Sequence, residues 1–111
     1  MNIGIDIEEV GRFKKYIKDQ AALSRIFSKE EIEYCLKKIY PAQHLGARFA
    51  AKEAVWKALN AKNPKILVTD ISVKTDSLGK PIVYVKSRKV KNIDVSLSHT
   101  KDYVAAVAIV F

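Results

Sequence analysis

The chain begins with an alternation of apolar and polar residues that is typical of a β-strand. Successive side chains of a strand point to opposite faces, so Asp6 lies on the face opposite the isoleucines that flank it. We therefore expect a strand at the start of the chain, with a carboxylate turned away from its isoleucine face. The residues are Ile3, Ile5 and Ile7 on one face and Gly4, Asp6 and Glu8 on the other.

A helical period follows this strand. Val10, Phe13 and Ile17 fall on one apolar stripe, and basic residues lie on the opposite side. The simple interpretation of a basic side on a single helix is a solvated surface. Its residues are Arg12, Lys15 and Lys18.

A second helix is marked by Ser28, which Glu31 follows three residues later. This spacing is typical of a capping box, in which each of the two side chains satisfies a backbone N–H group of the other residue. It predicts a helix that runs through about Lys38. Pro41 ends that helix or follows its end, because proline cannot donate a backbone hydrogen bond inside a helix. Cys35 lies within the helical pattern and is expected in the core or at an interface.

In the second half of the chain the period changes after residues 60–64, and two pairs of strands are predicted. The loop of the first pair, residues 76–80, contains Gly79 at a position where a positive φ is expected. Helices before strands in the sequence predict an α+β domain, with a mostly antiparallel sheet to which the first strand is added. The pairs are residues 70–75 with 81–86, and residues 94–98 with 103–111.

A long central helix is predicted over residues 45–59, which contain no proline and only Gly46 as a glycine. Bulky apolar side chains form one stripe at helical spacing, and alanines cover the back of the helix, where small side chains allow close packing. The bulky residues are Leu45, Phe49, Trp56 and Leu59, and the alanines are Ala47, Ala51, Ala54 and Ala58.

Four charged residues interrupt this helix, although a helix that is small or apolar nearly all round is usually buried. Glu53 and Lys57 could form an i,i+4 ion pair, worth about 0.3–0.5 kcal/mol at a surface, while Arg48 and Lys52 could extend to solvent. The alternative is a polar cleft beside the helix, in which Glu53 and Asp6 hold a metal ion and the cations bind phosphates. Magnesium suits that arrangement, because it usually takes one or two protein carboxylates and completes its shell with water and substrate phosphates.

Length and charge narrow the class of protein. A chain of 111 residues has room for one core, so we expect a single domain over residues 1–111. The formal net charge of +8 exceeds what solubility requires and favours an anionic partner, such as nucleic acid, an acidic protein or a phosphate-rich cofactor. No basic segment followed by a long apolar one opens the chain. We therefore expect neither a secretory signal nor a membrane span, and a cytoplasmic protein.

Four motifs together resemble the holo-acyl-carrier-protein synthase family in their order and spacing, almost from end to end of the chain. Any one of them would be weak evidence, but four in register over so short a chain are specific. They are residues 4–7 (GIDI), residues 48–54 (RFAAKEA) followed by residues 57–59 (KAL), residues 79–81 (GKP), and residues 96–100 (SLSHT).

The resemblance implies an enzyme of the phosphopantetheinyl transferase fold, which moves 4′-phosphopantetheine from coenzyme A to a serine of apo-acyl-carrier protein in fatty acid biosynthesis. Adenosine 3′,5′-bisphosphate is the second product. By the same resemblance Asp6 and Glu53 bind Mg²⁺, and Lys57 contacts the coenzyme A phosphates and takes part in handling the proton. The base that activates the carrier serine stays open between a metal-bound water and Glu53.

The resemblance also implies which residues bind coenzyme A. The glycine-lysine-proline turn and the serine-histidine-threonine segment line that site, and the central helix adds Arg48 and Lys52. A structural role for His99, which could simply order its turn, is the competing interpretation. The implied contacts are Arg48, Lys52, Lys57, Gly79, Lys80, Pro81, Ser98, His99 and Thr100.

The family receives an acidic carrier protein on its first helix, so the basic side described above gains an interpretation as a docking surface. Its predicted contacts are Arg12, Lys15, Lys18 and Arg25, and Phe13 is expected in the core. Members of the family form homotrimers with active sites at subunit boundaries. We therefore expect a homotrimer, in which a neighbouring subunit supplies some coenzyme A contacts.

Two other classes of protein would explain part of the pattern. A small basic nucleic-acid-binding module would account for the charge, but the strands lack interleaved aromatic and basic residues, and Asp6 and Glu53 would have no role. A magnesium phosphohydrolase would use the same ligands with water as the attacking group. We expect no nucleic acid and no membrane among the partners.

Overall fold

The computed structural model describes residues 1–61 and 65–111, so part of the predicted change of period at residues 60–64 lies outside the described residues. In this part of the chain, six strands form two antiparallel three-stranded sheets around one long helix, α3. The elements are β1 (Asn2–Glu9), η1 (Val10–Tyr16), α1 (Gln20–Ile26), α2 (Lys29–Leu36), α3 (Pro41–Asn60), η2 (Val68–Asp70), β2 (Ile71–Thr75), β3 (Pro81–Val85), β4 (Arg88–Lys89), β5 (Ile93–His99) and β6 (Tyr103–Val110).

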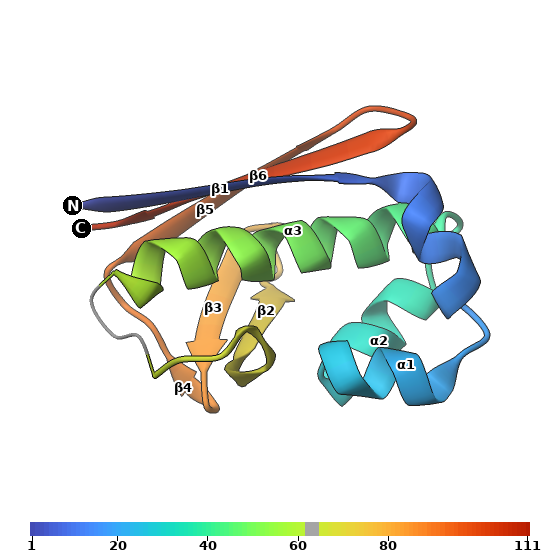
Figure 1. The fold of residues 1–111 in the computed structure, drawn as a ribbon, viewed down its shortest axis with the longest axis horizontal. Coiled ribbons are helices and arrows are strands. Elements are labelled where there is room, and N and C mark those ends of the chain that lie inside the picture. Colours follow the sequence, from blue (N-terminus) through green and yellow to red (C-terminus); the bar gives the residue numbers. More distant parts are fainter. Residues whose placement is uncertain (62–64) are drawn as a thin grey trace.

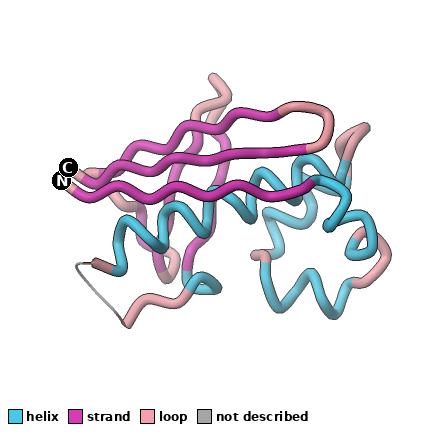
Figure 2. The backbone as a smooth tube through the Cα atoms, turned by 45° about the horizontal axis from the view of Figure 1, so that its top comes forward, coloured by secondary structure: helices cyan, strands magenta, loops and turns pink. Residues whose placement is uncertain are grey.

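The helix α3 lies between the two sheets. In Figure 1 the sheet β1-β6-β5 covers one side of α3, and β2, β3 and β4 lie on the other side with α1 and α2. Figure 2 shows the three long strands of the first sheet running side by side across the helix. The predicted α+β class is confirmed, and β1 does join the last strand pair. The strands nevertheless form two sheets where the pattern suggested one, because α3 separates them.

The start of α3 differs from the expectation that Pro41 ends or follows the preceding helix. Pro41 is the first residue of α3, a position at which the missing backbone N–H costs nothing and the fixed φ suits a helix. The capping box predicted for α2 is confirmed, with hydrogen bonds between Ser28 and Glu31 in both directions. Cys35 is fully buried, and burial raises the pKa of its thiol to about 12, so it is a packing residue.

The alanine side of α3 is its most deeply buried side. Ala54 and Ala58 are completely buried, whereas Phe49 and Trp56 of the bulky stripe are only half-buried. Small side chains allow β1 to approach closely, and Gly4 is the point of contact. A Cβ atom added to Gly4 would lie 1.9 Å from the backbone oxygen of Ala54, a separation that no side chain can occupy.

The basic segment after β1 is a 3₁₀ helix, η1, whereas the sequence predicted an α-helix. Three residues per turn bring Val10 and Phe13 into one row, and both are buried. The same period brings Arg12 and Lys15 into a second row, and both are exposed. The segment therefore has the predicted apolar and basic sides, but with three residues per turn, as in a 3₁₀ helix, and not the 3.6 of an α-helix.

The outer face of the first sheet is apolar and uncovered. The three isoleucines of β1 point away from α3 and are 63–66% exposed. Their partners on β6 lie on the same face, because paired residues of adjacent strands share a face. A monomer of this size rarely exposes a contiguous apolar patch of this kind, so the face is suited to an interface. Its residues are Ile3, Ile5, Ile7, Ala105, Val107 and Ile109.

Candidate active site

Asp6 faces α3 from the edge strand β1, where Lys57 reaches it. The Lys57 ammonium donates to the backbone oxygen of Ile5 at 2.9 Å and lies 3.5 Å from Oδ1 of Asp6. The second carboxylate oxygen of Asp6 is buried and has no hydrogen-bond partner among the described residues. An unpartnered buried carboxylate oxygen is costly, so this atom is suited to a cation or another donor.

Two further carboxyl groups surround Asp6. Burial raises the pKa of Glu53, and the negative charge of Asp6 adds to that effect, while Lys57 and Arg12 oppose it. Burial raises the pKa of Glu8 from 4.5 to about 7, and the neighbouring Asp6 carboxylate adds to the shift, against the attraction of Arg12. Burial is the main cause of both shifts, and the negative charge of Asp6 contributes to each.

These residues fit a magnesium ion. Crowded carboxyl groups around an unpartnered buried oxygen create a demand for positive charge that Lys57 alone does not meet. Within residues 1–61 and 65–111, no group of three histidine, cysteine, aspartate or glutamate side chains could enclose a metal. Magnesium usually takes one or two protein carboxylates and completes its shell with water and substrate phosphates. The effect of Asp6 on the pKa of Glu53 places these two carboxyl groups near each other, and their role as metal ligands stays a prediction.

The crowding predicts a pH dependence of stability for the metal-free protein. Because folding raises the pKa of Glu8 from 4.5 to about 7, its contribution is fully present below pH 4.5 and is lost as the pH rises through 7. Urea unfolding from pH 4 to pH 8 should show wild type losing stability relative to Glu8→Gln over that interval. The matched control Glu9→Gln, on the exposed face of the same strand, should follow wild type. A constant difference between wild type and Glu8→Gln would contradict the prediction.

Arg48 lies in a second, cationic part of the site. Its guanidinium is buried, donates to the Thr75 hydroxyl and stacks 4.5 Å above the Tyr34 ring. Nε of Arg48 is buried and has no hydrogen-bond partner in the described part of the chain. Because Thr75 pairs with Pro81, Arg48 lies beside the base of the hairpin that carries Gly79.

Histidines extend this cationic region. Burial lowers the pKa of His44, and the charges of Lys38, Arg48 and His99 lower it further. Gln43 and His99 are hydrogen-bonded at 3.2 Å. The positive charges of this region repel one another. A bound anion such as phosphate would offset that repulsion.

The sheet register relates this region to the carboxylates. His99 and Glu8 both pair with Val104, on the face of the sheet that covers α3. They are separated by two interstrand spacings, about 10 Å. The carboxylate cluster and His99 therefore lie on one face of the first sheet. The distance between them is one that a nucleoside with its diphosphate could bridge.

Other predicted coenzyme A residues are more dispersed. Ser98 points to the outer face, beside Ala105, and the Thr100 hydroxyl accepts a hydrogen bond from the Tyr103 backbone in the β5–β6 turn. Gly79 has a φ of +84°, as predicted for its turn. The Lys80 ammonium lies 3.6 Å from Asp94, and β5 places that end of the strand about 17 Å from His99.

Lys52 is the predicted coenzyme A residue that the structure does not support. Its side chain is 1% exposed and its ammonium is bound to Glu31 and to the backbone oxygen of Ile26. A lysine held this way inside the core cannot reach a bound nucleotide. The periodicity placed it at the edge of the bulky stripe, but could not show that α1 and α2 cover that edge.

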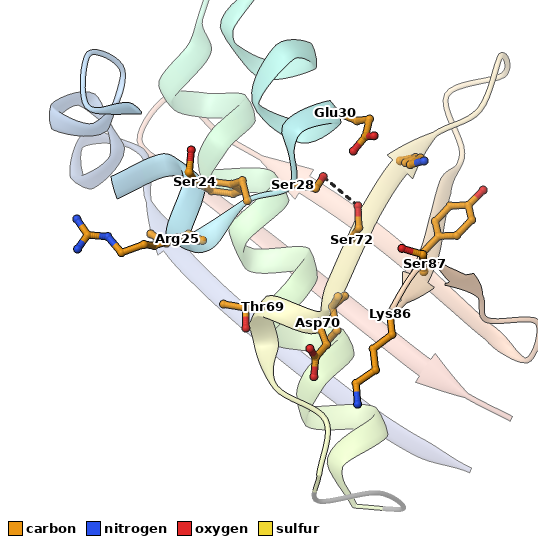
Figure 3. A pocket seen from close by; sticks show the side chains of 14 residues that line it. Ser24, Arg25, Ser28, Glu30, Thr69, Asp70, Ser72, Lys86 and Ser87 are labelled. Carbon is orange, nitrogen blue, oxygen red and sulfur yellow. Dashed lines mark hydrogen bonds between the residues drawn. The ribbon is translucent and has the colours of Figure 1, made fainter. Parts of the chain in front are cut away.

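The predicted carrier-protein contacts lie in two places. Arg12 donates to Glu8 and lies over the Phe49 ring, beside the carboxylate cluster, and Lys15 lies on the same row of η1. Lys18 follows in the turn before α1. Arg25 lies at the far end of α1 and lines a separate pocket of about 370 Å³ between α1 and β2 (Figure 3).

Several residues of the site were missed by sequence reasoning. Glu8 could have been found, because it shares the inward face of β1 with Asp6. His44 lies one helical turn before Arg48 and could also have been found once α3 was extended to Pro41. Tyr34 and Thr75 come from other elements, and nothing local in the sequence places either beside Arg48.

Known proteins resemble this chain in sequence and in fold. Residues 2–108 match the family described as the 4′-phosphopantetheinyl transferase superfamily. The chain therefore belongs to the 4′-phosphopantetheinyl transferase superfamily. It is 40% identical over 119 residues to a holo-[acyl-carrier-protein] synthase of Treponema denticola, covering 99% of this chain and 97% of the relative. It is 38% identical over 117 residues to that of Syntrophus aciditrophicus, covering 96% and 91%.

Solved structures show the same likeness. The holo-[acyl-carrier-protein] synthase of Helicobacter pylori, in complex with coenzyme A, superposes with a TM-score of 0.81 at 28% identity, covering 98% of this chain and 99% of that one. A Bacillus anthracis synthase, in complex with CoA (3′,5′-ADP), gives a TM-score of 0.78 at 30% identity, covering 98% and 94%. The resemblance stated from the four motifs and the predicted fold are both confirmed. In the described part of the chain, no helix has the length and apolar character needed to cross a membrane.

Proposed function

We propose that this protein transfers 4′-phosphopantetheine from coenzyme A to a serine of apo-acyl-carrier protein, in a Mg²⁺-dependent reaction that releases adenosine 3′,5′-bisphosphate. The observation that carries the proposal is the cluster of Asp6, Glu53 and Lys57 in a chain whose relatives are holo-[acyl-carrier-protein] synthases. The reaction would serve fatty acid biosynthesis in the cytoplasm.

Each residue of the cluster has a role in this reaction. Asp6 and Glu53 would hold the magnesium ion, which supplies charge neutralisation and polarisation of the phosphorus under attack. Lys57, whose side chain is 46% exposed, is free to bind a phosphate oxygen while its ammonium stays beside Asp6. Its positive charge would stabilise the transition state and the leaving phosphate. The carrier serine is the nucleophile, so the chain needs none of its own.

The cationic region would bind the rest of coenzyme A. Arg48 would add positive charge to this region, and His99 and Thr100 lie at the same end of β5. Gly79, Lys80, Pro81 and Ser98 are exposed or half-exposed, and lie toward other surfaces of the protomer. They support contacts with coenzyme A bound to a neighbouring subunit.

The exposed row of η1 would receive the acidic carrier protein. Arg12 connects this row to the carboxylate cluster through Glu8, so a carrier bound there would hold its serine near the metal-binding residues. Lys15, Lys18 and Arg25 would extend the cationic surface along η1 and α1. Electrostatic attraction of this kind favours rapid association with an acidic partner.

We propose a homotrimer with active sites at the subunit boundaries. The uncovered isoleucine face of the first sheet supports an association of subunits, because its burial would remove apolar area from water. A shallow hollow beside Asp6 and Lys57 continues onto this face at Ile5 and Ile7. A subunit packed there would therefore border the carboxylate cluster.

The interface can be tested with Ile5→Asp. Placing a carboxylate in the apolar face should convert a trimer into monomers and lower transfer activity by about tenfold or more, because burying an unpaired charge is costly. Light scattering coupled to gel filtration measures the mass. Leu67→Asp, at an apolar residue that is 62% exposed before η2, should leave both mass and activity unchanged. A monomeric wild type, or a trimeric Ile5→Asp variant, would contradict the proposal.

The reaction itself is tested by incubating the protein with coenzyme A, Mg²⁺ and several apo-acyl-carrier proteins, followed by mass spectrometry of the carrier. We expect a phosphopantetheine adduct and an equal amount of adenosine 3′,5′-bisphosphate. Cleavage of coenzyme A without an adduct would indicate a phosphohydrolase. No adduct on any carrier would refute the proposal.

A further inference from the structure

Lys52 and Glu31 form a charged pair in the interior of the domain. Their side chains are 1% and 0% exposed, and Nζ of Lys52 lies 2.9 Å from Oε1 of Glu31. The same ammonium donates to the backbone oxygen of Ile26 at 2.6 Å and lies over the ring of Phe27. Glu31 also accepts from the backbone N–H groups of Ser28 and Val73, both at 2.9 Å.

This network joins elements that are distant in the sequence. Lys52 belongs to α3, Ile26 ends α1, Glu31 lies in the first turn of α2, and Val73 lies in β2. Every contact is a directional hydrogen bond to a charged group, so the network is satisfied in one arrangement of the elements. Figure 3 shows the segment that ends α1 facing β2, where the Ser28 and Ser72 hydroxyls are 3.2 Å apart.

The helix α1 depends on such an anchor. Its seven residues are too few to form a stable helix alone, and Ala22 and Leu23 are its buried residues. Ile26 and the C-cap residue Phe27 also pack against the core, but apolar contacts are non-directional and would tolerate a slide or rotation of α1. The hydrogen bond from Lys52 to the last carbonyl of α1 does not.

We propose that Lys52 is a positioning residue, which through Glu31 and Ile26 holds α1, the helix that carries the predicted docking residue Arg25, at a set distance from the predicted metal ligand Glu53. Lys52 and Glu53 are consecutive on α3, and consecutive side chains of a helix point about 100° apart. Lys52 therefore points toward the core, while Glu53 points toward β1. This inference rests on the proposed transfer to a carrier protein.

The test variant is Lys52→Met with Glu31→Gln. Together they remove both buried charges, retain the side-chain volume and keep a carbonyl oxygen for one of the two backbone N–H groups, of Ser28 and Val73, that donate to Glu31. We expect cooperative unfolding in urea and a KM for coenzyme A within about twofold of wild type. We expect the KM for apo-acyl-carrier protein to rise about fivefold or more, with faster amide hydrogen exchange over residues 22–28.

A second variant covers failure of the double variant to fold. Glu31→Asp keeps both buried charges and shortens the carboxylate side chain, which weakens its contact with Lys52 without leaving the ammonium unpaired. It should give a smaller rise in the KM for the carrier, in the same direction. Trp56→Phe removes a 2.7 Å hydrogen bond to Ile66 at the other end of α3 and serves as the control for general destabilisation. It should change neither KM.

The outcomes separate this inference from the proposed function. Absence of transfer by wild type would refute the transferase proposal and leave the anchoring of α1 to be judged by hydrogen exchange. Transfer by wild type with an unchanged carrier KM in both Lys52→Met/Glu31→Gln and Glu31→Asp would overturn the positioning role. A rise in the carrier KM for Trp56→Phe equal to that of the double variant would overturn it as well.

Discussion

Glu53→Gln is expected to lower the rate of phosphopantetheine transfer by about 10²–10⁴-fold while the protein keeps its fold. Glutamine preserves the shape of the side chain and removes the negative charge that would hold the magnesium ion opposite Asp6. Burial and Asp6 already raise the pKa of Glu53, so the charged carboxylate is disfavoured in the metal-free protein. Its removal should therefore leave stability at pH 8 equal to or above that of wild type.

Three measurements check this expectation. Steady-state transfer gives the rate, urea unfolding without metal gives the stability, and titration with Mn²⁺ followed by electron paramagnetic resonance gives the metal affinity. The control is Glu33→Gln, the same substitution at an exposed residue of α2. Substantial remaining activity with unchanged Mn²⁺ affinity would remove Glu53 from the metal site. Loss of the fold would instead identify it as a structural residue.

Gly4→Ala is expected to destabilise the protein by about 3 kcal/mol or more, at the upper end of the cost of overpacking. The new methyl group would lie 1.9 Å from the Ala54 oxygen and 2.9 Å from the Ala58 nitrogen, and these are backbone atoms that cannot rotate away. The edge strand β1 would have to move off α3. Because the neighbouring Ile5 oxygen accepts the Lys57 hydrogen bond, that movement would also disturb the carboxylate cluster.

Gly11→Ala is the matched control, since nothing lies within 4 Å of a Cβ atom at that position. We expect it to change stability by no more than about 0.5 kcal/mol. Urea unfolding at one protein concentration compares the two variants, because subunit association would make the midpoint depend on concentration. Equal stabilities of Gly4→Ala and Gly11→Ala would contradict the close approach of β1 to α3.

The extent to which local pattern predicted the fold varies between elements. The capping box of α2 was predictable because its donors and acceptors lie within four residues of one another. The helix α1 and the two-residue strand β4 were not predicted, since neither is long enough to show a period. The predicted strand over residues 81–86 ends at Val85, because Lys86 and Ser87 adopt positive φ angles without a glycine to signal the turn.

In the candidate site, too, some features were predictable from local pattern and others were not. Alternation along β1 set Asp6 apart from the isoleucines, and helical spacing set Glu53 apart from the bulky stripe of α3. The motifs then indicated that both belong to one site. Spacing could not separate Lys52 from Lys57, although one is sealed in the core and the other reaches the edge strand.

By itself, the sequence determined the periods of β1 and α3, the family and the residue types available for chemistry. These properties depend on neighbours along the chain. Tertiary structure alone decided which face of each element is covered. The isoleucine face of β1 is exposed because Gly4, on the other face, allows α3 to pack closely. Lys52 is buried because Glu31 and Ile26, more than 20 residues away, meet its charge.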